Sequence, residues 1–166
     1  LIEILEEKPM IEKMNFYFYD SLKRKQDNLS NIGNIQIKKL RNIYFDIAKK
    51  YLFIEKKNNK TIIDKLPLNI KDVGFIHKVF PESKFIFVLR HPCDSVLSCF
   101  MNRFGMNNAM INFYTLSDTA NFYNKIMLLW KQYITVLPIR YNTIKYEDII
   151  ENIEKSIKPL INFINV

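Results

Sequence analysis

The chain has 166 residues, and its 25 Lys and Arg against 17 Asp and Glu give a formal net charge of +8. Apolar residues make up 48% of the chain, which excludes an intrinsically disordered protein. Two cysteines cannot build a disulfide framework, and no apolar run approaches the roughly 18–20 residues that cross a bilayer. We expect a soluble chain with one core, no membrane span and no metal site, and the free cysteines favour the reducing cytoplasm.

The basic excess favours anionic ligands. Much of it consists of Lys pairs scattered among Asn and Ile, such as those at 38–39 and 49–50. We interpret these Lys pairs as parts of solvated helix faces rather than as a binding patch. Nucleic acid is therefore not an expected partner.

Hydrophobic periodicity predicts helices in the first third of the chain. A helix runs from Leu1 to about Lys25 and is bent by Pro9, a polar loop covers 26–34, and a second helix covers 35–54. We treat 1–55 as a helical segment.

The pattern then changes to alternating strands and helices. Strands are predicted at 61–63, 84–89 and 139–146, and helices at 69–80, 92–104, 118–136 and 147–165, the last one kinked at Pro159. The segment 84–89 is nearly all apolar, which is typical of a strand buried on both faces of a parallel sheet. This alternation predicts an α/β part over 60–166, with a parallel sheet flanked by helices.

The strand ends are the places to look for chemistry, because ligands of open α/β sheets bind beyond the carboxyl ends of the strands. Arg90 follows the apolar strand and supplies a planar, permanent charge suited to phosphate. The next helix begins two or three residues later and offers free N–H groups, and Ser98 lies within it. These residues form a candidate phosphate clamp. The structural alternative is that Arg90 pairs with Asp94 or Glu147 and that Ser98 is a small buried residue.

Four segments in this order resemble the sulfotransferase superfamily. The resemblance is closest to the bacterial branch linked to tetratricopeptide repeats, which is similar to tyrosylprotein sulfotransferases, and it covers roughly residues 35–166. It is carried by Asp-Lys-Leu-Pro-Leu-Asn at 64–69, Phe-Pro-Glu-Ser-Lys-Phe-Ile at 80–86, Arg-His-Pro at 90–92 with Asp94, Ser98, Cys99 and Phe100, and Lys-Tyr-Glu-Asp-Ile at 145–149.

The resemblance implies a fold, a co-substrate and roles for four residues. The fold is the P-loop-nucleoside-triphosphatase-like sulfotransferase fold, and the family transfers a sulfuryl group from 3′-phosphoadenylyl sulfate (PAPS) to a hydroxyl or phenol. By resemblance, Arg90 and Ser98 hold the 3′-phosphate, and Tyr146 lies near the nucleotide. Lys65 matches a lysine near the transferring sulfuryl group, where a positive charge stabilises the transition state. The acceptor, hydroxyl- or tyrosine-bearing, is not defined by the sequence.

The chain also departs from the family. Members begin with a strand and a Gly-rich loop that cradles the 5′-phosphosulfate, whereas the three glycines here are dispersed. No carboxylate or histidine sits in a motif that matches the catalytic base. We therefore interpret 1–166 as a single partial domain that lacks its first strand and phosphosulfate loop, with tetratricopeptide repeats as a candidate upstream neighbour. The alternative is a truncated or degenerate domain that binds a nucleotide or a partner without catalysis.

Overall fold

The computed structural model describes residues 2–6, 10–11, 13–14, 18, 32–51, 61–102, 104–105 and 109–165. The chain divides into two compact units, Leu1–Ser83 and Lys84–Asn165, and each is described by itself below. Within these described ranges, no helix is long and apolar enough to cross a membrane.

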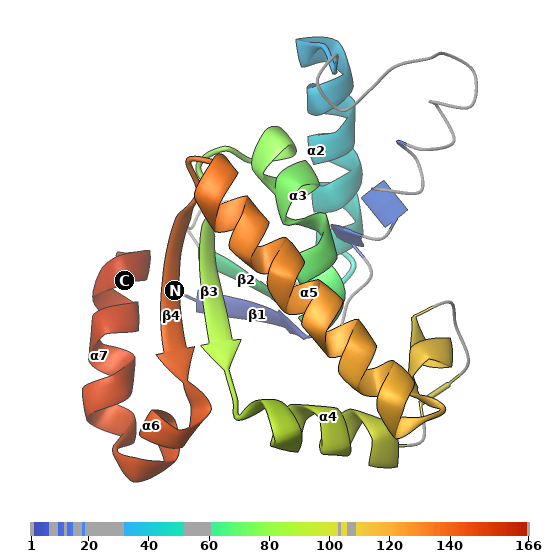
Figure 1. Ribbon diagram of the computed structural model, residues 1–166. Helices are drawn as coiled ribbons and strands as arrows, with labels where there is room; N and C mark the ends of the chain where they lie inside the picture. Colours follow the sequence, from blue (N-terminus) through green and yellow to red (C-terminus); the bar gives the residue numbers. More distant parts are fainter. Residues whose placement is uncertain are drawn as a thin grey trace. The chain divides into compact units, whose positions relative to one another are not determined.

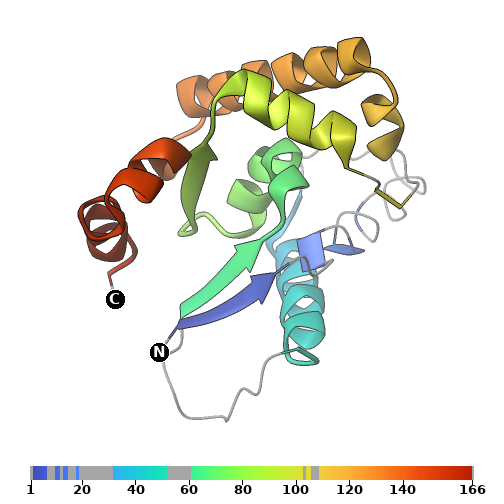
Figure 2. The ribbon, with the colours of Figure 1, turned by 90° about the horizontal axis from the view of Figure 1, so that it is seen from below.

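The first unit contains two parallel strands, β1 (Ile2–Glu6) and β2 (Thr61–Lys65). They pair in register from Ile2 opposite Thr61 to Glu6 opposite Lys65, and Figure 2 shows them side by side. The helices that accompany them over residues 32–83 are α2 (Asn34–Ala48), the 3₁₀ helix η2 (Pro67–Asp72) and α3 (Val73–Val79).

The prediction of a helix from Leu1 is wrong over Ile2–Glu6, which form β1. The apolar spacing at the start of the chain fits either element, and the β-branched Ile2 and Ile4 suit a strand. Pairing with β2 decides the outcome, and sequence periodicity contains no information about that pairing. The unit thus has a strand ahead of α2 that the sequence did not predict. Farther along, residues 10–11, 13–14 and 18 are helical, as predicted, whereas most of 7–31 lies outside the described residues.

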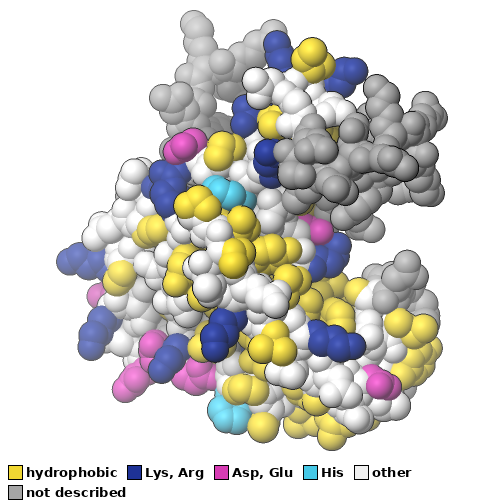
Figure 3. All heavy atoms as spheres, turned by 45° about the horizontal axis from the view of Figure 1, so that its top comes forward, with side chains coloured by type: hydrophobic (Ala, Val, Ile, Leu, Met, Phe, Trp, Pro, Cys, Tyr) yellow, Lys and Arg dark blue, Asp and Glu magenta, His cyan; other side chains and the backbone are white. Residues whose placement is uncertain are grey.

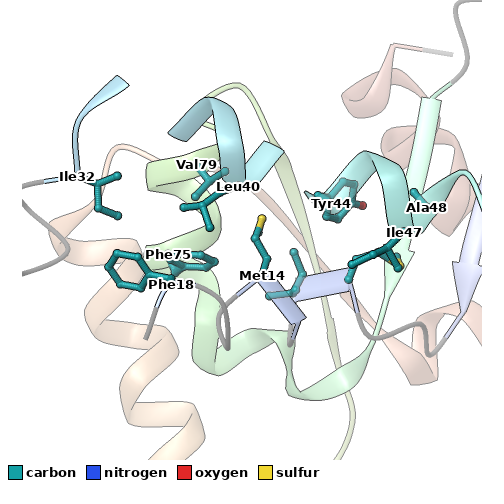
Figure 4. Close-up of a cluster of buried hydrophobic side chains, with 11 residues drawn as sticks. Met14, Phe18, Ile32, Leu40, Tyr44, Ile47, Ala48, Phe75 and Val79 are labelled. Carbon is teal, nitrogen blue, oxygen red and sulfur yellow. The ribbon is translucent and has the colours of Figure 1, made fainter. Parts of the chain in front are cut away.

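The core of the first unit joins α2, α3 and the helical residues near the start of the chain (Figure 4). Met10, Met14 and Val79 are fully buried within it. Phe18 and Phe75 lie with their ring centroids 5.4 Å apart. Each such buried side chain contributes roughly 1.5–3 kcal/mol to the free energy of unfolding, so this cluster is the main source of stability in the first unit.

The second unit contains the parallel pair β3 (Lys84–Leu89) and β4 (Arg140–Lys145). A parallel pair needs a long crossover, which here contains α4 (Pro92–Met101), the 3₁₀ helix η3 (Met110–Phe113) and α5 (Leu116–Val136). After β4 the chain forms α6 (Tyr146–Glu151) and α7 (Ile153–Ile164). Figure 1 shows α4 leaving the end of β3 and α6 leaving the end of β4.

Strand β3 has the predicted bounds, but it is not buried on both faces. Phe87 stacks on Trp130 of α5 with centroids 4.7 Å apart, so this side of the strand is covered. On the opposite side, Ile86 and Val88 are 37% and 54% exposed. The apolar run was therefore a correct signal for a strand and a wrong signal for its surroundings.

The last predicted helix is interrupted at a different residue from the one expected. Pro159 lies inside α7, whereas the break falls at Asn152, whose backbone is extended. The Asn152 side chain accepts a 3.0 Å hydrogen bond from the Lys155 main-chain N–H and so caps α7. The short polar side chain thus starts a new helix, at a residue where the sequence predicted an uninterrupted one. Parallel strands flanked by helices confirm the predicted α/β class.

Candidate functional site

The carboxyl ends of β3 and β4 meet at one edge of the second unit. Their register places Leu89 opposite Lys145, so the residues that follow, Arg90 and Tyr146, are neighbours. The Arg90 guanidinium carbon lies 5.3 Å from the centroid of the Tyr146 ring, a cation–π distance. Two of the four predicted site residues are therefore brought together by strand pairing.

Arg90 also faces a carboxylate, as the structural alternative proposed. Its Nε lies 3.9 Å from Oδ2 of Asp94, and the two side chains are 42% and 56% exposed. An ion pair this long and this exposed contributes little and leaves most guanidinium donors open to solvent. Arg90 and Asp94 thus form an ion pair, but this pair leaves the Arg90 guanidinium able to bind another anion.

The start of α4 is the second component of the site. His91 is the N-cap residue, Pro92 begins the helix, and the His91 side chain makes no capping hydrogen bond. The Ser95 N–H bonds back to the His91 carbonyl, while the N–H groups of Cys93 and Asp94 precede the first intrahelical bond. An uncapped helix start beside a guanidinium is a favourable environment for an anion.

Glu147 links the two strand ends. Its Oε1 accepts a 2.9 Å hydrogen bond from the His91 main-chain N–H. The pKa of Glu147 lies below its usual value because its own main-chain N–H and that of His91 donate to the carboxylate, with smaller contributions from the charges of His91 and Arg90. Glu147 was one of two candidate partners for Arg90, whereas its hydrogen-bond partner is the main-chain N–H of His91.

Ser98 lies on α4 in the same unit, and its side chain is half-buried. No hydrogen bond joins it to Arg90 among the bonds of the described residues. Cys93 and Cys99 of α4 are both free thiols. Trp130 is buried against Phe87 and Tyr141, so it packs the interior of the second unit.

Lys65, the fourth predicted residue, is the last residue of β2 in the first unit, and its side chain is exposed. Beside it lies a polar cluster that the sequence analysis missed: Asp64 accepts hydrogen bonds from Tyr44 at 3.1 Å and from Asn69 at 3.3 Å. Burial raises the pKa of Asp64 in spite of these bonds. The sequence could have indicated this cluster only through an Asp at a strand end, because the partner of Asp64 in α2, Tyr44, lies 20 residues away in sequence.

No other type of centre is evident in the part of the chain that the structure describes. Its residues contain no group of three or more His, Cys, Asp and Glu that could hold a metal ion. On the face drawn in Figure 3, Lys and Arg side chains are scattered rather than gathered into one patch.

Comparison with known proteins bears on the family and the fold of the chain. A solved structure, the sulfotransferase domain from the curacin biosynthetic pathway, matches with a TM-score of 0.50 and 19% identity, over 83% of this chain and 52% of that one. An uncharacterized protein of Aquifex aeolicus (strain VF5) is 26% identical over 103 residues, or 61% of this chain and 14% of that protein. The chain thus spans about half of the solved domain and a small part of the Aquifex protein. A sequence model of the sulfotransferase family matches residues 12–166, and the chain belongs to this family.

Proposed function

We propose that this chain is the part of a sulfotransferase that holds the nucleotide of PAPS, for transfer of the sulfuryl group to a hydroxyl or phenol acceptor. Family membership supplies the reaction class, a sulfonate donor and an acceptor. The single observation that carries the assignment is the placement of Arg90 over Tyr146 beside the uncapped start of α4.

The 3′-phosphate is the group that this edge suits best. Arg90 offers several N–H donors in a plane, and the Tyr146 ring limits how far the guanidinium can swing. Its exposed pair with Asp94 is weak enough for a phosphate to replace it. Ser98 adds a hydroxyl donor from α4, the helix that follows Arg90. Together these groups would distinguish a 3′-phosphorylated nucleotide from one without that phosphate.

The chemistry assigned to Lys65 concerns the other end of the donor. In the transfer, the acceptor oxygen forms a bond to sulfur while the bond from sulfur to the bridging phosphate oxygen breaks. The acceptor proton goes to a base, and 3′-phosphoadenosine 5′-phosphate leaves. A lysine at the sulfuryl oxygens offsets the negative charge that develops during this exchange.

A thermal-shift titration with 3′-phosphoadenosine 5′-phosphate, against ADP of similar charge, tests the nucleotide assignment. A ligand that binds only the folded chain raises its melting temperature by mass action. We expect a shift with the 3′-phosphorylated nucleotide that exceeds the shift with ADP. The Arg90→Ala variant should lose roughly 1.5–3 kcal/mol of binding, the scale of a hydrogen bond to a charged group. Arg140→Ala, which removes the same charge at the amino end of β4, is the matched control. Equal shifts with both nucleotides, or an unaffected Arg90 variant, would contradict the assignment.

A further inference from the structure

The Asp64 carboxylate is tied to two other elements of the first unit. Its Oδ2 accepts a hydrogen bond from the Tyr44 hydroxyl of α2 at 3.1 Å, and its Oδ1 accepts one from the Asn69 side-chain amide of η2 at 3.3 Å. Both carboxylate oxygens are therefore engaged, and the end of β2 is joined to the helices before and after it.

The Tyr44 hydroxyl is held in a fixed position by the core. Tyr44 is 7% exposed, and its ring meets the edges of Phe45 and Phe80 at centroid distances of 5.4 and 5.1 Å. Figure 4 shows Tyr44 among the buried side chains of this cluster. Because this packing restricts the ring, the core sets the place of the hydroxyl donor that Asp64 meets.

The same carboxylate closes a short loop around the candidate catalytic lysine. The Asp64–Asn69 side-chain bond spans residues 65–68, and within this span the Asn69 main-chain N–H donates to the Leu66 carbonyl at 2.9 Å. Pro67 further restricts the backbone at the start of η2. Lys65, the last residue of β2, thus lies between two residues that are bonded to each other, Asp64 and Asn69, and Asp64 is also bonded to α2, while the Lys65 side chain is exposed.

This arrangement is not the one that stability alone would favour. Burial raises the pKa of Asp64 even though two donors lower it, so placing the ionised carboxylate here has a net cost. Burial, and then the Asp64 charge, raises the pKa of Tyr44 as well. Well-packed apolar residues often stabilise such a site more than a buried polar pair does.

We propose that Tyr44, Asp64 and Asn69 are positioning residues that fix the loop from which Lys65 projects, and so place its amino group at the sulfuryl group of the donor. This inference depends on the role of Lys65 in the proposed function. The three residues touch neither donor nor acceptor in it, and they act only through the lysine.

Hydrogen exchange tests the mechanical part without any ligand. Tyr44→Phe removes one hydroxyl and keeps the packed ring, and Tyr141→Phe, on β4 of the other unit, is the matched control. We expect amide exchange in the peptide that covers 65–69 to accelerate in Tyr44→Phe and in Asn69→Ala, and to stay at the wild-type rate in Tyr141→Phe. An unchanged rate in both network variants would overturn the proposal.

Ligand preference tests the functional part. The quantity measured by calorimetry is the ratio of affinities for PAPS and for 3′-phosphoadenosine 5′-phosphate, which isolates the contribution of the sulfuryl group. We expect Tyr44→Phe to lower this preference about tenfold, the loss of one hydrogen bond to a charged group. In a Lys65→Ala background, Tyr44→Phe should have no further effect, a result that general destabilisation would not produce.

The outcomes separate the inference from the function on which it depends. If the wild-type chain binds neither nucleotide, the proposed function fails and the inference fails with it. If the wild type prefers the sulfuryl-bearing donor and Tyr44→Phe keeps that preference, only the inference is overturned. A further loss in the Lys65→Ala background would also overturn it, because the network would then act independently of the lysine.

Discussion

The main-chain N–H of His91 donates a 2.9 Å hydrogen bond to Oε1 of Glu147, across 56 residues of chain. The two residues follow the carboxyl ends of β3 and β4, which pair only up to Leu89 and Lys145. The bond therefore continues the connection between the two strands past the end of the sheet. It keeps Arg90 close to Tyr146, the first residue of α6.

This bond predicts a pH dependence for Glu147. The folded-state pKa of this carboxyl lies below its usual value of about 4.5, so its contribution to stability is present above that pH and is lost as the pH falls through the lowered folded value. We expect the melting temperature of Glu147→Gln to fall less than that of the wild type between neutral pH and pH of about 3. Glu151→Gln, farther along α6, is the control. Parallel curves for the wild type and Glu147→Gln would contradict the prediction.

For Asp64 we expect a pH dependence of stability with the opposite sign to that of Glu147. Its folded-state pKa is raised, so its contribution to stability is fully present below the usual Asp pKa of about 3.9 and declines as the pH rises through the raised folded value. Asp64→Asn cannot ionise, and its free energy of unfolding should lack this decline. Urea unfolding at a series of pH values provides the comparison, and a decline that persists unchanged in the variant would refute the assignment.

The Tyr146 ring is expected to matter for the nucleotide through Arg90. Tyr146→Phe keeps the aromatic face beneath the guanidinium and should preserve affinity for 3′-phosphoadenosine 5′-phosphate. Tyr146→Leu removes that face and should weaken binding by about 0.5–1 kcal/mol, the scale of an exposed cation–π contact. Calorimetric titration of the two variants decides. Equal weakening in both would assign the effect to the hydroxyl instead.

Trp130 is expected to be a main determinant of stability in the second unit. It is 7% exposed, stacks on Phe87 and meets the Tyr141 ring at 5.6 Å. Trp130→Ala should reduce the free energy of unfolding by about 3–5 kcal/mol, through lost burial and a residual cavity. Unfolding in urea should be followed by circular dichroism, because the variant loses the single tryptophan of the chain and with it the tryptophan fluorescence signal. Trp130→Phe should recover part of the loss, and a variant as stable as the wild type would show that α5 does not depend on this contact.

The N-cap of α5 is expected to contribute less to stability than Trp130 does. Thr115 Oγ1 accepts a 3.0 Å bond from the Asp118 N–H and lies 2.7 Å from its carboxylate. Thr115→Ala should reduce stability by about 1 kcal/mol, the usual value of an N-cap, and Thr115→Ser should keep most of it. Thermal unfolding of the pair provides the measurement. If serine and alanine destabilise equally, the cap is not the cause.

Sequence reasoning was effective where local patterns determine the structure. An apolar run between polar ends fixes β3, and an Arg after such a strand lies at a sheet edge whatever the rest of the chain does. It was ineffective where distant segments decide. Pairing with β2 makes Ile2–Glu6 a strand, and Tyr44 reaches Asp64 only because α2 packs beside β2. The open face at Ile86 and Val88 likewise depends on which elements cover β3, which the composition of the strand does not reveal.

The parallel pairing of β3 with β4 has a consequence for how the second unit folds. The two strands cannot meet until α4, η3 and α5 have brought the chain back, so the entropy of closing this long loop opposes the pairing. Contacts between β3 and α5 are expected to form first, with β4 added last. Tyr146 directly follows β4, so Arg90 acquires its aromatic partner only when that final strand is in place. Recovery of nucleotide binding during refolding would then time the last step rather than the collapse of the chain.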